Sequence, residues 1–141
     1  MNADTEAKLL FNARVTVRWG DMDAFNHVNN AVYSTYLEEA RLRWFATFDG
    51  AWERDDSAPV IAAMNIDFRR PIVWPAEVVV ELFAGRVGRS SIATVFRMSD
   101  RDVPETVYAE GECVMVWIDP RSGKSVGLPE AVLKAMATAA V

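Results

Sequence analysis

The sequence predicts an α+β domain in which one long, buried helix packs against a curved antiparallel sheet. Three observations support this prediction: alternating apolar residues near the start, a four-residue apolar period over residues 30–48, and four strand-like runs after it. The last three runs are joined by short polar turns instead of crossover helices. Strands joined in this way pair antiparallel, and one helix packed on such a sheet is an α+β arrangement.

The first predicted strand covers residues 12–19. Val15, Val17 and Trp19 alternate with polar residues, so we expect these three side chains on one buried face. Residues 20–29 then break the alternation with small and turn-forming side chains.

The predicted helix covers residues 30–48 and would be about 28 Å long at 1.5 Å per residue, enough to span a sheet. Its apolar stripe consists of Val32, Tyr36, Ala40, Trp44 and Phe48, widened by Tyr33, Leu37 and Phe45. Four charged side chains fall largely away from that stripe: Glu38, Glu39, Arg41 and Arg43. Asn29 or Asn30 is the expected N-cap.

The later predicted strands cover residues 60–70, 77–87, 91–98 and 105–118. In the first of these, Met64, Ile66 and Phe68 are expected to face inward. A short terminal helix after Pro129 is expected to place Val132, Leu133 and Met136 on one side.

Composition limits the classes of protein that this chain can be. Its 141 residues, 51% of them apolar, fit a single folded domain over residues 1–141. A net charge of −5 argues against a broad nucleic-acid-binding face, and one cysteine excludes an internal disulfide. There is no long uncharged apolar run and the first residues are acidic, so we expect no membrane span, no secretory signal and a cytoplasmic location.

The segment 19–33 holds the residues best suited to chemistry. It contains Asp21, Asp23, the chain's single histidine (His27) and the start of the predicted helix. A helix N-terminus offers unpaired N–H groups that suit a developing oxyanion, and a nearby carboxylate supplies a nucleophile or general base. Acids at this position also serve as simple caps, so spacing alone leaves both interpretations open. One histidine and two aspartates do not form a convincing ligand set, so we expect neither metal nor cofactor.

The run 17–33, Val-Arg-Trp-Gly-Asp-Met-Asp-Ala-Phe-Asn-His-Val-Asn-Asn-Ala-Val-Tyr, resembles hot-dog-fold acyl-CoA thioesterases of the 4-hydroxybenzoyl-CoA thioesterase family. It is most similar to the branch with the motif Asp-x-Asp-x-x-x-His-Val-Asn-Asn, which includes long-chain acyl-CoA thioesterases. The stretches 68–71 and 88–91 resemble further parts of the family. The resemblance implies a sheet wrapped around the central helix and hydrolysis of a fatty or aromatic acyl-CoA to the free acid and CoA.

The resemblance also assigns roles to residues. It implies that Asp23 is the nucleophile or the base for water, and that the backbone N–H of Asn30 polarises the thioester carbonyl. His27 joins them as a catalytic candidate, although a lone histidine is more often structural. Coenzyme A is expected near Gly88, Arg89, Ser90 and Ser91. Family members form homodimers with sites between subunits, often paired into tetramers.

Two other functions remain open at this stage. A hot-dog enoyl-CoA hydratase or dehydratase would carry Gly-Asp-x-Asn-Pro-x-His, whereas the segment 20–27 is one residue longer and lacks the proline. A non-catalytic acyl-CoA-binding protein on the same fold would not need Asp23, so the presence of this acid favours catalysis.

Overall fold

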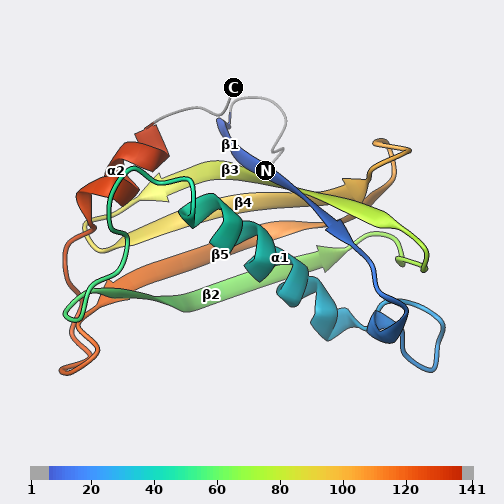
Figure 1. The fold of residues 1–141 in the computed structure, drawn as a ribbon, viewed down its shortest axis with the longest axis horizontal. Helices are drawn as coiled ribbons and strands as arrows, with labels where there is room; N and C mark the ends of the chain where they lie inside the picture. The colour runs from blue at the N-terminus through green and yellow to red at the C-terminus, as the bar shows by residue number, and fades with distance from the viewer. Residues whose placement is uncertain (1–6, 138–141) are drawn as a thin grey trace.

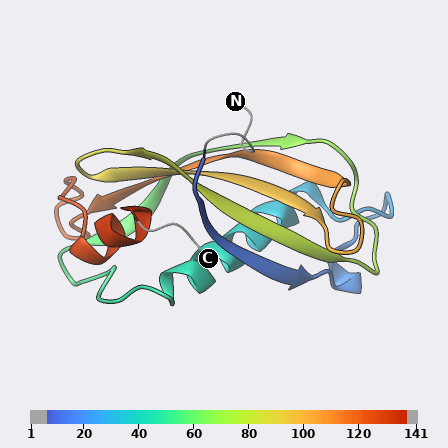
Figure 2. The same ribbon diagram turned by 90° about the horizontal axis from the view of Figure 1, so that it is seen from above.

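In the computed structural model, which describes residues 7–137, one curved sheet wraps around one long helix (Figures 1 and 2). The sheet contains β1 (Leu9–Thr16), β2 (Ala58–Phe68), β3 (Glu77–Val87), β4 (Ser91–Asp100) and β5 (Val107–Ile118). Their order is β1-β3-β4-β5-β2, and every neighbouring pair is antiparallel. The α+β architecture predicted from the sequence is confirmed. The acidic start of the chain, residues 1–6, lies outside the described residues.

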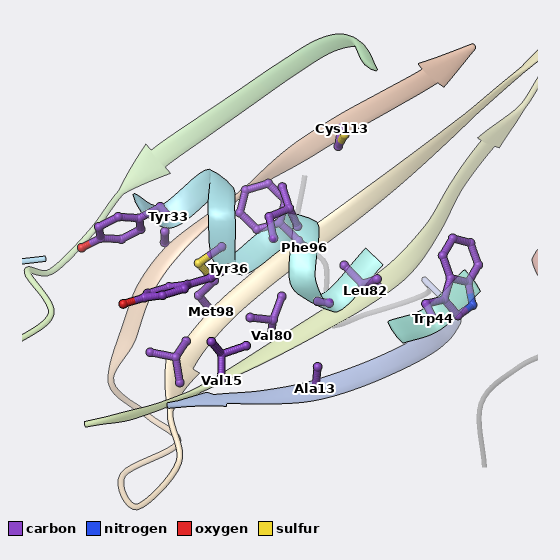
Figure 3. Packing of buried hydrophobic residues seen from close by; sticks show 14 of the residues in the cluster. Ala13, Val15, Tyr33, Tyr36, Trp44, Val80, Leu82, Phe96, Met98 and Cys113 are labelled. Atoms are coloured by element: carbon purple, nitrogen blue, oxygen red, sulfur yellow. The ribbon is translucent and has the colours of Figure 1, made fainter. Parts of the chain in front are cut away.

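Helix α1 (Asn30–Phe45) lies across the concave face of the sheet. Its apolar stripe is buried as predicted, with Tyr36, Leu37, Ala40 and Trp44 at most 3% exposed. These side chains meet the inner faces of β1, β3, β4 and β5 (Figure 3). The helix ends three residues earlier than predicted, because the N–H groups of residues 47 and 48 bond carbonyls three residues back and the chain turns tightly there.

Two predictions of buried side chains are wrong, one at the end of a strand and one in the terminal helix. β1 stops at Thr16, and Trp19 is 73% exposed in a short 3-10 turn instead of buried. The reason is that the Arg18 N–H bonds the carboxylate of Asp21 at 3.0 Å, which folds the chain away from the neighbouring strand. In the short helix α2 (Glu130–Ala137), Val132 is buried, whereas Leu133 is 47% exposed.

Strand β2 is paired on one side only, with β5. Met64 and Phe68 were expected in the core, yet they remain 38% and 47% exposed, and Val60 and Ile61 are similarly uncovered. The rings of Phe68 and Tyr33 pack in a T-shaped arrangement, with 4.9 Å between their centroids. Because β2 is an edge strand in the described part of the chain, residues 7–137 leave much of its apolar surface uncovered.

Candidate active site

The loop between β1 and α1 is anchored by the buried carboxylate of Asp21. One oxygen accepts bonds from the Arg18 N–H at 3.0 Å and the Tyr36 hydroxyl at 2.7 Å, and the other accepts from the Arg18 guanidinium at 3.0 and 3.2 Å. Burial by itself raises the pKa of Asp21, but the bonds from Arg18 and Tyr36 and the Arg18 charge outweigh it and lower this pKa below its ordinary value. Asp21 is therefore an ionised anchor joining the loop to the second turn of α1.

Asp23 lies in the next turn with its carboxylate partly exposed. Its Oδ1 accepts from the Phe25 N–H at 2.9 Å, and its Oδ2 accepts from the Asn29 side-chain amide at 3.2 Å. The backbone of the turn is closed by the Asp23 N–H bonding the His27 carbonyl at 3.0 Å. Each oxygen of Asp23 accepts one of these bonds, and a carboxylate oxygen can accept about two.

The start of α1 is capped by Asn29, in agreement with the sequence prediction. The Asn29 side chain accepts from the Ala31 N–H at 2.9 Å while its amide donates to Asp23, so one residue links the carboxylate to the helix N-terminus. Within residues 7–137, no acceptor bonds the N–H of Asn30. An unpaired N–H at the positive end of a helix dipole is suited to stabilise an oxyanion.

The structure places Asp23, His27 and Asn30 in one loop at the start of α1, but their side chains differ in exposure and hydrogen bonding. The His27 side chain is exposed and forms no hydrogen bond in the described part of the chain, while its carbonyl closes the Asp23 turn. A pocket of about 220 Å³ opens beside the first turn of α1, lined by Asn30, Tyr33, Phe68, Arg69, Arg70 and Pro71. This pocket gives a ligand direct access to the helix N-terminus.

The segment from Gly88 to Ser91 forms the β3–β4 hairpin turn, closed by the Gly88 N–H bonding the Ser91 carbonyl at 2.7 Å. It lies at the opposite end of the sheet from Asp23, because β3 starts beside Thr16 and runs eleven residues away from it (Figure 1). Eleven strand residues span about 36 Å. The predicted catalytic and CoA-binding residues of one chain therefore do not meet.

Sequence reasoning missed the partnership of Asp21 with Tyr36, which are 15 residues apart. A signal was present: a tyrosine on a buried helical stripe needs a partner for its hydroxyl, and the loop before the helix carries two acids. Arg41 was expected away from the apolar stripe, but it is only 9% exposed.

A thioesterase-like superfamily model matches residues 17–136. The chain belongs to this superfamily. The PA2801 protein of Pseudomonas aeruginosa, a provisionally assigned thioesterase, is 41% identical and superposes with a TM-score of 0.83 over 92% of this chain and 99% of that one. The provisionally assigned acyl-CoA thioesterase XC229 of Xanthomonas campestris is 47% identical, with a TM-score of 0.75 over 84% of this chain and 100% of that one.

A curated relative, the long-chain acyl-CoA thioesterase FadM of Escherichia coli, is 39% identical over 62 residues, which is 43% of this chain and 47% of FadM. Together with the superfamily match, these likenesses confirm the predicted hot-dog fold and the predicted class of thioester hydrolase. Among the described residues, no helix is long and apolar enough to span a membrane, and no group of three or more His, Cys, Asp or Glu side chains could hold a metal ion.

Proposed function

We propose that this protein hydrolyses fatty or aromatic acyl-CoA thioesters, with Asp23 and the N–H of Asn30 as its reacting groups. The observation that carries the proposal is the Asn29 side chain, which bonds Asp23 and the helix N-terminus at once. Asn29 thereby holds the Asp23 carboxylate beside the start of α1, where the N–H of Asn30 is unpaired. This is the arrangement that acyl transfer needs, a nucleophile or base beside an oxyanion-stabilising donor.

In the proposed reaction, the thioester oxygen accepts a bond from the Asn30 N–H as negative charge develops on it. Asp23 either attacks the carbonyl carbon, giving an anhydride that water then hydrolyses, or removes a proton from an attacking water. Both routes form the free acid and release the CoA thiolate, which takes up a proton from solvent. The likeness to FadM and XC229 supports CoA as the thiol and the branch predicted from the Asp-x-Asp motif.

The central experiment is hydrolysis by Asp23→Asn, measured as release of free thiol from a panel of acyl-CoAs. We expect activity to fall about 10²–10⁴-fold for loss of a general base, and further for loss of a nucleophile. Asp56→Asn is a matched control, because Asp56 is an exposed acid in the loop after α1. Near wild-type turnover in Asp23→Asn would refute the site and favour a non-catalytic acyl-CoA-binding protein.

We further propose a homodimer formed by the free edges of β2, and a dimer of dimers beyond it. Two copies paired antiparallel at this edge are related by a two-fold axis that reverses the strand direction. The partner's β3–β4 hairpin then lies at the same end as the first copy's Asp23. This supports a shared site in which Asp23 and Arg89 come from different chains.

Mixing two inactive or weakened variants tests the shared site. In a heterodimer of Asp23→Asn with Arg89→Ala, one site carries an intact Asp23 and an intact Arg89, and the other carries neither. We therefore expect the mixture to regain a component with wild-type KM, which neither variant shows alone. A mixture that behaves as the sum of its parts, or a light-scattering mass of a single chain at micromolar concentration, would contradict this assembly.

A further inference from the structure

Arg41, on the fourth turn of α1, is buried without an anionic partner among residues 7–137. Arg41 is 9% exposed, its Nη1 donates to the Cys113 sulfur at 3.7 Å, and within residues 7–137 it forms no ion pair. Burial raises the pKa of Cys113 and the Arg41 charge only partly counteracts this, so the thiol stays protonated and does not neutralise Arg41. Because desolvating a charge is costly, buried cations are normally paired with an anion.

Arg41 lies in the wall of a pocket of about 250 Å³ between the second half of α1 and the start of β2. We call this the distal pocket. Its lining combines apolar side chains, among them Leu42, Phe45, Ile61 and Met115, with three charged ones, Arg41, Glu38 and Glu53. Apolar side chains beside a buried cation are suited to a ligand that combines a hydrocarbon body with a negative end.

The distal pocket lies on the same side of α1 as the proposed reaction site. Leu37 and Arg41 follow Asn30 by seven and eleven residues, which is close to two and three whole turns at 3.6 residues per turn. Eleven residues separate Arg41 from Asn30 by about 16 Å along the helix. Strand β2 reaches both ends of this path, since Val60 and Ile61 line the distal pocket and Phe68 lines the pocket at Asn30.

The length of this path sets the length of a ligand that spans it. An extended chain of single bonds advances about 1.2 Å per bond, taken from ~3.6 Å for the three backbone bonds of a residue. About 16 Å therefore corresponds to about thirteen bonds. An acyl group of fourteen carbons, with its thioester carbonyl at Asn30, would place its last carbon beside Arg41.

Two carboxylates also line the distal pocket, those of Glu38 and Glu53. Both residues are exposed, so water screens their charges, whereas the charge of Arg41 is buried. The buried charge of Arg41 therefore favours binding of an anion in the distal pocket. The two exposed glutamates weaken this preference without removing it.

We propose that the distal pocket binds the far end of the acyl group and that Arg41 selects long acyl groups ending in a carboxylate. This inference rests on the proposed acyl-CoA hydrolysis and narrows its substrate class to CoA thioesters of long-chain dicarboxylic acids. The ω-carboxylate accepts two hydrogen bonds from the planar guanidinium, the geometry that arginine offers to a carboxylate. Arg41 acts as a specificity residue and touches no reacting atom.

Calorimetric binding to Asp23→Asn tests the pocket separately from the reaction. Tetradecanedioyl-CoA should bind about 10- to 100-fold more tightly than myristoyl-CoA, the range expected for hydrogen bonds to a charged group. Arg41→Met should abolish this preference while leaving the affinity for myristoyl-CoA within about twofold. Glu38→Gln is the matched control, since removing a competing carboxylate should keep or increase the preference.

Several results would overturn the proposal. One is equal affinity for the two ligands, and another is an unchanged affinity when the ω-carboxylate is masked as its methyl ester, a comparison that needs no Arg41 variant. A third is an Arg41→Met protein that keeps the preference but loses its dimeric mass, which would assign Arg41 to a carboxylate of a second copy. Failure of the proposed function looks different, because wild-type protein would then release no thiol while the binding preference persisted.

Discussion

Replacing Tyr36 with phenylalanine tests whether the buried bond to Asp21 holds the loop between β1 and α1, which carries Asp23, against the helix. The variant removes one hydroxyl whose distance to the Asp21 carboxylate is 2.7 Å, and Asp21 keeps its three bonds from Arg18. Hydrogen bonds to charged groups contribute about 1.5–3 kcal/mol, so the free energy of unfolding should fall by that amount. This is a large part of a typical stability of about 5–15 kcal/mol.

The same variant should lower kcat more than it raises KM. The Asp21 carbonyl accepts from the Asn29 N–H at 3.0 Å, and Asn29 in turn positions Asp23 and the helix start. A loosened anchor therefore misplaces the reacting groups, and displacements of about 1 Å cost up to about 10²-fold in rate. We expect kcat to fall about tenfold, which is midway on a logarithmic scale between no loss and the 10²-fold limit.

The assay pairs urea unfolding at pH 7 and fixed protein concentration with thiol-release kinetics. Tyr108→Phe is a matched control, because the Tyr108 hydroxyl bonds the Asp100 carboxylate at 2.9 Å on the β4–β5 hairpin, whereas the Tyr36 hydroxyl bonds the loop that holds Asp23. It should destabilise the fold comparably and leave kcat unchanged. A double-mutant cycle of Tyr36→Phe with Asp21→Asn should show a coupling of about 1 kcal/mol or more. Zero coupling, or equal effects of both tyrosine variants on kcat, would refute the reasoning.

Three further outcomes are expected. Arg89→Ala should raise KM for acyl-CoA with little change in kcat. This increase should shrink in high salt and be absent for a short acyl-pantetheine substrate. An equal increase for both substrates would show that Arg89 supports the hairpin fold instead of binding the nucleotide. His27→Ala should keep kcat within about tenfold if only its backbone serves the Asp23 turn, and a larger loss would show that the imidazole takes part. Folding lowers the pKa of Asp21 below its ordinary value of 3.8. The ionised carboxylate therefore contributes its full stabilisation above about pH 3.8, and this contribution is lost as the pH falls through the lowered pKa of the folded state. Acid titration of the unfolding free energy should show this loss in wild type and not in Asp21→Asn.

Sequence reasoning reached the fold because the local patterns agree with the tertiary structure. The four-residue period of Tyr36, Ala40 and Trp44 can bury one face only as a helix, and that face is buried. The Asn29 cap follows from the preference of asparagine for accepting an N–H at a helix start. Short polar turns between the last three strands require antiparallel neighbours, as observed.

The same reasoning failed where a residue's surroundings come from distant parts of the chain. Alternation predicts which strand residues share a face, but it cannot tell that β2 is an edge strand, so Met64 and Phe68 were assigned to a core that does not reach them. Trp19 continues the alternation of β1, yet the bond from Arg18 to Asp21 turns the chain before it. Helical spacing placed Arg41 off the apolar stripe, whereas the sheet and the start of β2 enclose it.

The sequence by itself determined the elements, the cap and the motif around Asp23, since each depends on residues that are neighbours in the chain. Tertiary structure alone decided that Asp21 is an anchor bonded to Tyr36, that the 88–91 turn lies far from Asp23, and that Arg41 is buried in a pocket. The physical reason is that burial and charge pairing depend on the order of strands in the sheet. That order is fixed by contacts between distant segments, which no local period encodes.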